Sequence, residues 1–127
     1  MNEIVEKDNI KIEDMIYEIR GKYVMIDRDL AKLYQTETRI LNQRVKRNIE
    51  RFPNSFCFQM TEDEFLNWKS QIVMSNSDKI GLRRAPYVFT EQGVAMLSAI
   101  INTDVAVEVS IRIMNVFVEM KNIYHLP

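Results

Sequence analysis

The segment from Asp104 to Tyr124 restricts the fold of this chain more than any other stretch. It has helical periodicity, and its polar side chains form one narrow stripe of Glu108, Arg112, Asn115, Glu119 and Asn122. Ser110 is the only polar residue on the opposite side, and nearly all of the remaining surface is Val, Ile, Met or Phe. We therefore expect this helix to be covered from two sides, by the core and by a second copy of the chain.

Two β-rich runs near the N-terminus predict a hairpin. Residues 16–19 and 23–26 flank Arg20-Gly21-Lys22, where the glycine is able to adopt a positive φ. The acidic stretch before them, residues 1–14, has no clear period and is predicted to be a partly ordered arm. Asp27 is placed to cap a short helix from Arg28 to Tyr34.

The middle of the chain carries start and stop signals for two helices. Thr36 is the predicted N-cap of a helix that ends at Phe52, because Pro53 disfavours α geometry in the residue before it. A strand is predicted over residues 55–60. The capping-box pattern of residues 61–64 then predicts a helix through Trp68.

The second half of the chain completes a single predicted domain. Residues 69–85 are polar and irregular, which indicates a surface loop. Residues 86–89 read as a short edge strand, because proline at the first position costs no ladder bond. Thr90 is the predicted cap of a helix through Ile101, which Asn102-Thr103 separate from the last helix.

These elements predict an α+β fold. A small antiparallel sheet, made from the hairpin and two short strands, packs with about five helices. The predicted domain spans residues 15–124, after the arm of residues 1–14 and before a tail of residues 125–127. At 127 residues, with 46% hydrophobic and 28% charged residues, the chain has the composition of one ordinary soluble domain.

Composition also bears on the cellular compartment. Cys57 is the single cysteine, so it cannot form an internal disulfide, and we interpret it as a core thiol in a reducing compartment. No stretch approaches the roughly 18 apolar residues of a membrane span. The N-terminus lacks the basic and apolar regions of a signal peptide. We expect a cytoplasmic protein that does not bind membranes.

Positive charge is concentrated in one predicted helix. Between Arg39 and Arg51 there are five basic residues and one acidic residue, so this stretch carries +4 and the rest of the chain, whose net charge is −1, carries −5. On a helical wheel, one face consists of Leu41, Val45, Asn48, Ile49 and Phe52. The opposite face consists of Arg39, Gln43, Lys46, Arg47 and Glu50.

The order of elements around this basic helix is typical of a helix-turn-helix. A short helix, a two-residue break at Gln35-Thr36 and a longer helix follow one another, and the longer helix would enter the major groove of DNA. Gln35 stands where glycine is often found. The alternative is a solvated face on an ordinary core helix, and the sequence leaves both interpretations open.

The side chains of the basic helix suit DNA recognition. Arginine makes bidentate contacts to guanine, and asparagine or glutamine makes them to adenine. The candidate base readers are Arg39, Asn42, Gln43, Arg44 and Arg47. The candidate phosphate contacts are Lys46 and Arg51 on the helix, and Arg83 and Arg84 as flanking clamps. The hairpin tip, residues 20–22, is a further possible clamp.

Catalysis has little support in the sequence. The only histidine, His125, has no cysteine neighbours, which argues against zinc sites and histidine triads. Residues 119–121 have the E-x-K spacing of some nucleases, but they lie in a helical pattern and read as surface charge. The three glycines are too far apart to form a phosphate-binding loop. We expect no enzymatic activity, no cofactor and no metal.

Several ordered blocks, from about Ile16 to Met120, resemble a known family. They are DLAKLY at 29–34, LNQRVKRN at 41–48, RFP at 51–53, FQMT at 58–61, SQIVMSN at 70–76 and PYVFTEQGVAMLS at 86–98. These blocks resemble the ORF-six N-terminal (ORF-six-N) domain family. That family is grouped with the KilA-N and Bro-N domains of phages and large DNA viruses.

The resemblance implies a function and a setting. It implies a sequence-specific double-stranded DNA-binding module of a prophage or mobile-element regulator, repressor or antirepressor-like, in the cytoplasm of a bacterial host. Such modules are often followed by a separate C-terminal domain, so this chain is expected to be the N-terminal part of a longer protein.

Two further expectations concern partners. A homodimer joined through the helix Asp104 to Tyr124 would set two basic helices against half-sites about 34 Å apart. The alternative function is a protein–protein interaction module in which this apolar C-terminal helix is the working surface. A nuclease is a more distant alternative.

Overall fold

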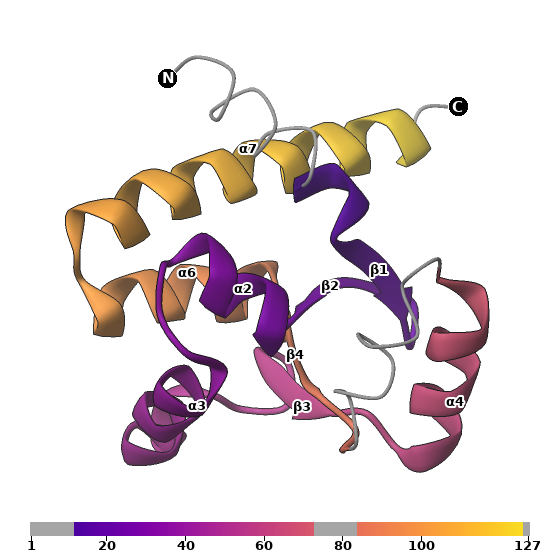
Figure 1. The fold of residues 1–127 in the computed structure, drawn as a ribbon. Coiled ribbons are helices and arrows are strands. Elements are labelled where there is room, and N and C mark those ends of the chain that lie inside the picture. Colours follow the sequence, from indigo (N-terminus) through magenta and orange to yellow (C-terminus); the bar gives the residue numbers. More distant parts are fainter. Residues whose placement is uncertain (1–11, 73–83, 126–127) are drawn as a thin grey trace.

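A four-stranded antiparallel sheet is the centre of the computed structural model, which describes residues 12–72 and 84–125. The strands lie in the order β1-β2-β4-β3 and span Ile16–Ile19 (β1), Lys22–Ile26 (β2), Cys57–Gln59 (β3) and Tyr87–Thr90 (β4). The helices are α2 (Asp27–Leu33), α3 (Thr38–Arg47), α4 (Glu62–Gln71), α6 (Glu91–Ile101) and α7 (Asp104–His125), with a 3-10 turn, η1 (Ile49–Arg51) (Figure 1). The predicted α+β fold is confirmed.

Two predicted segments fall largely outside the described residues. They are the arm of residues 1–14, of which 12–14 are described, and the loop of residues 69–85, of which 73–83 are not. Residues 12–14 form a helical turn, and the Ile12 side chain is completely buried in the core. The packed part of the domain therefore includes this residue.

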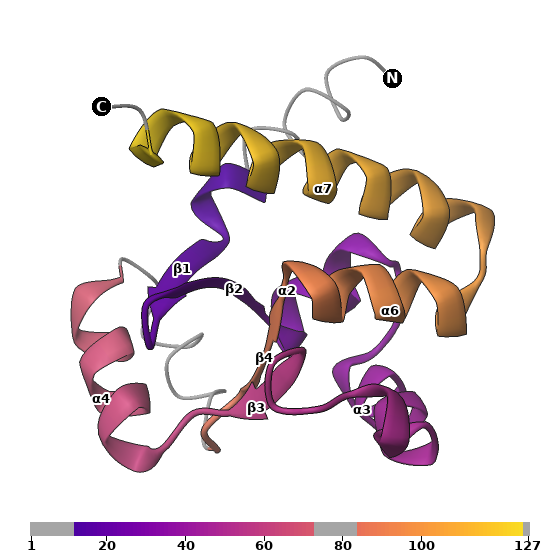
Figure 2. The same ribbon diagram turned by 180° about the vertical axis from the view of Figure 1, so that it is seen from behind.

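The sheet carries a hydrophobic cluster on each face because successive strand residues point to opposite sides. Met25 and Phe89 belong to the larger cluster, together with buried residues of α2, α6 and α7. Val24 and Val88 belong to the smaller cluster, in which Phe65 and Trp68 of α4 are also buried. Helix α4 thus covers one face of the sheet, while α2, α6 and α7 lie toward the other (Figures 1 and 2).

The predicted hairpin is confirmed, and its turn is held by a tertiary contact. Arg20 and Gly21 both have positive φ, of 56° and 72°, as a two-residue type I′ turn requires. The Arg20 guanidinium donates to the Glu64 carboxylate from Nε at 2.7 Å and Nη2 at 3.0 Å. It also lies 4.0 Å above the centre of the Phe58 ring. These contacts anchor the hairpin tip to the start of α4.

The start signals of two helices are confirmed. Thr61 forms the predicted capping box: its hydroxyl accepts from the Glu64 backbone N at 3.1 Å, and its own N donates to Glu64 Oε1 at 2.8 Å. The Thr90 hydroxyl accepts from Gly93 N at 3.3 Å and begins α6. Asn102, in the left-handed conformation at φ 47°, ends α6 before α7 begins.

The prediction that residues 86–89 form an edge strand is wrong. Strand β4 lies between β2 and β3, with Phe89 opposite Met25 on one side and Cys57 on the other. Proline is tolerated beside this central strand because Pro86 precedes the ladder. The Pro86 carbonyl accepts a hydrogen bond from Met60 N at 3.0 Å. Proline has no backbone N–H, and at this position before the ladder no strand hydrogen bond requires one.

The predicted caps of α2 and α3 are also wrong. Helix α2 begins at Asp27 itself, with Ile26 at the N-cap position. Helix α3 begins at Thr38 after Glu37, so Thr36 is not its cap, and neither N-cap has a side-chain capping bond. A turn at the C-terminal end of α2, and not a side-chain cap, reverses the chain between the two helices. Gln35, at φ 60°, completes a Schellman motif in which its N donates to Lys32 O at 3.1 Å and Thr36 N donates to Ala31 O at 2.9 Å.

The basic helix is shorter than predicted. Helix α3 ends at Arg47, and Ile49–Arg51 form the separate turn η1. Asn48 leaves helical geometry at φ −124° and ψ 34°, and its Nδ2 donates to Arg44 O at 2.8 Å. Such a local side-chain bond competes with helix continuation. Arg51 is consequently outside α3.

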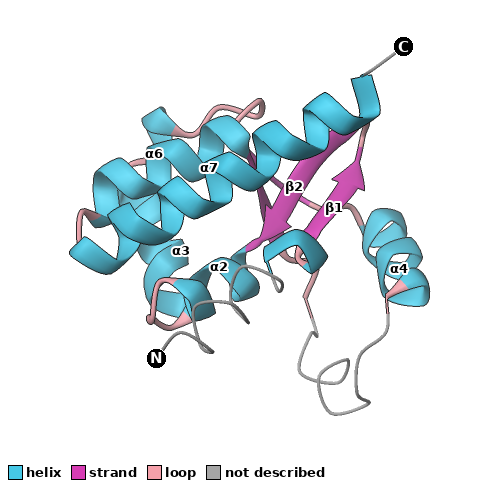
Figure 3. Cartoon of the chain, turned by 90° about the horizontal axis from the view of Figure 1, so that it is seen from above, coloured by secondary structure: helices cyan, strands magenta, loops and turns pink. Residues whose placement is uncertain are grey.

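Helix α7 packs through one face and exposes another. Its buried side chains are Ala106, Val109, Ser110, Ile113 and Phe117. The hydroxyls of Ser110 and Tyr34 are 2.9 Å apart and form a buried hydrogen bond between α7 and α2. Figure 3 shows α7 lying over α6 on the outside of the domain. The predicted cover by the core is confirmed for one side of the helix.

Candidate nucleic-acid interface

An open groove runs between α3 and the segment that leads into β4. It has a volume of about 720 Å³, and we call it the α3 groove. One wall consists of Thr38, Arg39, Asn42, Gln43 and Lys46 of α3. The other wall consists of Gln59, Arg84, Ala85, Pro86 and Tyr87, and Asp27 and Arg28 of α2 complete the lining.

The α3 wall follows from helical spacing. Arg39, Gln43 and Lys46 are separated by four and three residues, so they lie on one side of the helix. All three side chains are exposed, whereas Leu41 and Val45 of the same helix are buried in the core. The apolar face fixes α3 to the domain, and its polar face is thereby presented to the groove.

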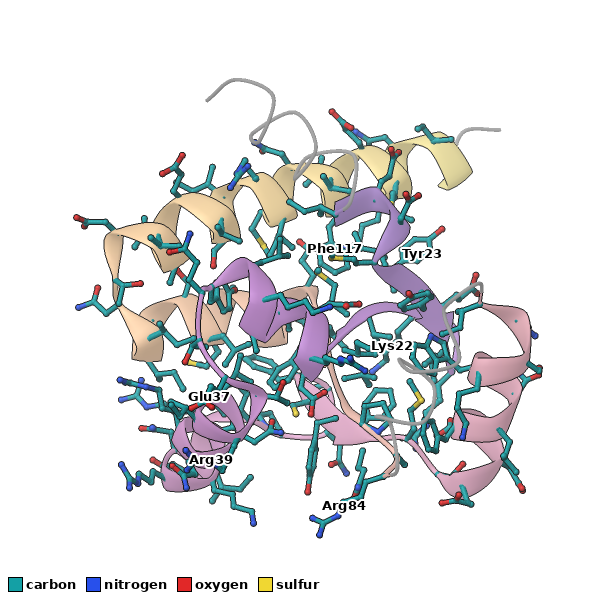
Figure 4. The ribbon with its side chains drawn as sticks, in the orientation of Figure 1. Lys22, Tyr23, Glu37, Arg39, Arg84 and Phe117 are labelled. Atoms are coloured by element: carbon teal, nitrogen blue, oxygen red, sulfur yellow. The ribbon has the colours of Figure 1, made fainter. Side chains whose placement is uncertain are left out.

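The α3 groove is rich in cationic side chains. Among the described residues, Arg28, Arg39, Lys46 and Arg84 line it, against one carboxylate, Asp27. Arg39 Nη2 lies 3.5 Å from Glu37 Oε2, with side chains 68% and 69% exposed, so water screens this pair and its contribution is small. Figure 4 shows Arg39 and Arg84 at the same edge of the domain, on different segments. The groove therefore favours anionic ligands.

Asp27 lies at the inner end of the groove. It is 5% exposed, and its Oδ2 accepts from Asn42 Nδ2 at 2.9 Å and from Tyr87 N at 3.4 Å. Its Oδ1 accepts from the Arg28 backbone N at 2.7 Å. Burial raises the pKa of Asp27, and the hydrogen bonds from Asn42, Arg28 and Tyr87 oppose that rise.

A side-chain hydrogen bond and the pairing of β3 with β4 hold the second wall. Gln59 Nε2 donates to Ala85 O at 2.9 Å, so the β3 side chain is tied to the segment that carries Arg84. Tyr87 is paired with Gln59 in the β3–β4 ladder. This wall is thus an extension of the sheet, with fixed positions relative to α3.

The structure brings together five of the predicted site residues: Arg39, Asn42, Gln43, Lys46 and Arg84. Three others do not line the groove. Arg44 Nη1 donates to Ile100 O at 3.4 Å, near the end of α6, while Arg47 lies in the last turn of α3 and Arg51 lies in η1, both exposed. Arg83 lies outside the described residues.

Sequence reasoning named none of the other seven groove residues as site residues, and Arg28, Gln59 and Tyr87 are among these seven. A signal existed for Gln59, because it is a polar residue between Phe58 and Met60, which are both buried. Alternation of this kind places the polar side chain on the accessible side. Tyr87 and Arg28 had no such signal, since their position depends on how β4 and α2 pack against α3.

The structure places the single cysteine, Cys57, inside the domain. Cys57 is buried in the larger cluster, which confirms the predicted core thiol. Burial, with a smaller effect of the Asp27 charge, raises the pKa of its thiol to about 12, so it is not a reactive thiolate at neutral pH.

Across residues 12–72 and 84–125, no helix has both the length and the apolar character needed to cross a membrane.

Comparison with protein-family models identifies a family for this chain. The family model of the ORF6N domain matches residues 14–100, which include β1 through almost all of α6 and every described residue of the α3 groove. The chain matches no curated protein and no solved structure at a significant level.

Proposed function

The chain belongs to the ORF6N domain family, and we propose that it binds double-stranded DNA through the α3 groove as part of a phage-related regulator. One observation carries this proposal. Arg84 lines the same groove as Arg39, Gln43 and Lys46, although about forty residues of sequence separate it from these three. A cationic surface on an otherwise acidic chain favours a polyanionic partner.

The chemistry of the groove supports both parts of DNA recognition. Lys46 and Arg84 suit phosphate oxygens, which fix the position of the protein on the duplex. Gln43 and Arg39 have the donors and acceptors that distinguish bases in the major groove. The pair α2–α3, joined by the Schellman turn at Gln35, supports presentation of α3 in the manner of a recognition helix. We extend the proposal to a repressor or antirepressor-like role in the bacterial cytoplasm.

Selection of bound sites from a random duplex pool tests the proposal, because enrichment of one sequence reports binding and specificity together. Lys46→Gln and Arg84→Gln should each weaken binding to all duplexes and make the salt dependence shallower by about one charge. Lys32→Gln is the matched control, since Lys32 is an exposed lysine of α2 that does not line the groove. Equal losses in all three variants, or no retained duplex, would overturn the proposal.

A second candidate function is self-association through α7. Val107, Ile111 and Val118 are 43%, 57% and 48% exposed, and with Met114 they recur at intervals of four, three and four residues. This spacing is that of a helix–helix seam, which a second copy of α7 would complete. We propose a homodimer on this basis.

The two proposed surfaces are separate. Figures 1 and 2 show α7 and α3 on opposite sides of the domain, with α6 between them. Phe117, which faces the interior, is completely buried and is not available to a partner. DNA binding and self-association would therefore not compete for the same residues.

A further inference from the structure

The hydrogen bond between Asp27 and Asn42 determines how the amide of Asn42 is oriented. A carboxylate accepts hydrogen bonds and donates none, so it selects the nitrogen of the amide over the oxygen. The Asn42 Nδ2 to Asp27 Oδ2 distance of 2.9 Å fits this assignment. Because Asp27 is buried and also accepts from the backbone of Arg28 and Tyr87, the carboxylate itself has little freedom to rotate.

One donor and one acceptor of Asn42 are left by this arrangement. The amide nitrogen has two hydrogens, of which Asp27 takes one, and the described residues give Oδ1 no hydrogen bond of its own. A free N–H beside a free carbonyl oxygen is the pair that binds adenine, through N7 and the 6-amino group. Asn42 lines the α3 groove beside Gln43, where a base edge would lie.

The geometry points to a specificity device: Asp27 fixes the amide of Asn42 so that the α3 groove recognises an adenine. Asp27 is the positioning residue, and Asn42 is the residue that touches the base. This inference rests on the proposed function, because it requires a duplex in the groove. It adds to that function the identity of one base and the group that makes its recognition selective.

A modified base provides a direct test. In the duplex selected from the random pool, each adenine is replaced in turn by 7-deazaadenine, which lacks the N7 acceptor and otherwise keeps the same shape. One replacement should lower the affinity of the unmodified protein by about fivefold or more. With Asn42→Ala, the same replacement should have no effect, because the contact is already lost.

The role of Asp27 is tested by the same comparison of affinities for the adenine and the 7-deazaadenine duplex. Asp27→Asn keeps the shape of the side chain but lets the amide of Asn42 turn, so the preference for adenine over 7-deazaadenine should fall below about twofold. Asn48→Ala is the matched control, because it removes another asparagine hydrogen bond, to Arg44 O, at the C-terminal end of α3. This control should keep the preference. Thermal unfolding of each variant ensures that binding is compared well below its melting temperature.

The possible outcomes separate this inference from the proposed function. If no duplex binds the unmodified protein, the proposed function fails and the inference fails with it. If a duplex binds but no 7-deazaadenine weakens it, DNA binding stands and the adenine contact is wrong. If Asp27→Asn weakens all duplexes equally while the preference for adenine persists, Asp27 has only a structural role and the inference is overturned.

Discussion

Gly93 lies against the backbone of Phe56 so closely that a Cβ on Gly93 would be 1.9 Å from the Phe56 carbonyl oxygen. The same carbonyl accepts a hydrogen bond from Thr90 N at 3.0 Å. The segment before β3 and the first turn of α6 are therefore in direct backbone contact. This contact holds β3, and with it the Gln59 wall of the α3 groove, against the start of α6.

Gly93→Ala should destabilise the fold by about 2 kcal/mol or more, because the added methyl group meets backbone that cannot rotate away. Gly21→Ala is an informative comparison, since a Cβ there has open space and only the positive φ opposes it. Its cost should be about 1 kcal/mol. Urea denaturation measures both free energies of unfolding, and equal costs would contradict the importance of the contact with Phe56.

Gln35→Gly should stabilise the protein by about 0.5–1 kcal/mol. Gln35 has a φ of 60° at the end of α2, where a side chain is strained and glycine is not. Gln35→Val should have the opposite effect, because a β-branched side chain tolerates this conformation least. A glycine variant no more stable than the unmodified protein in thermal unfolding would show that Gln35 makes a compensating contact.

The Arg20–Glu64 pair should make stability depend on acid pH. The hydrogen bond from Arg20 lowers the pKa of Glu64 from 4.5 to about 2, so the carboxylate stabilises the fold above pH 4.5 and that contribution is lost between pH 4.5 and 2. Because Arg20 is 43% exposed, the effect should be about 0.5–1 kcal/mol. Glu64→Gln keeps the capping box and should remove this part of the acid sensitivity.

Arg20→Met tests the same pair from the other side. It should remove the same acid sensitivity as Glu64→Gln, and the double variant should show no additional change. Chemical denaturation at pH 6, 4 and 2.5 gives the comparison. A Glu64→Gln variant that loses stability with acid as steeply as the unmodified protein would show that other carboxylates carry the effect.

Sedimentation tests self-association through α7. The unmodified protein at micromolar concentration should have a mass well above the 15.1 kDa of one chain. Ile111→Glu should return it to the monomer mass without a large loss of stability, because this side chain is 57% exposed. Phe117 is unsuitable for the test, since its replacement would disrupt the core. A monomer mass for the unmodified protein would require withdrawal of the dimer.

The elements that sequence predicted well are those with local signals. Thr61 and Glu64 form a capping box within four residues, and Gly21 allows a tight turn between two β-rich runs. Each signal acts through neighbouring atoms, so the rest of the fold hardly alters it. Asp27 and Thr36 have the same chemistry as good caps. In the folded protein, however, the Asp27 carboxylate accepts a hydrogen bond from Asn42, and α3 starts one residue later than expected.

The candidate site was predictable on α3 and less so elsewhere. Helical spacing places Arg39, Gln43 and Lys46 together, and the structure agrees. The direction of Arg44 toward α6 depends on packing between helices that are far apart in sequence. The second wall depends on the pairing of β3 with β4, which lies between two strands in a position that the sequence pattern did not reveal. DNA binding itself stays a prediction.

The salt dependence of duplex binding tests the central claim most directly. With about four to six phosphates neutralised by the basic side chains of α3 and the residues around it, the logarithm of the affinity should fall linearly with the logarithm of salt concentration, at a slope of about −4 to −5. Fluorescence anisotropy of a labelled duplex, measured at salt concentrations between about 50 and 300 mM, gives this slope. A slope near zero would contradict DNA binding through the α3 groove.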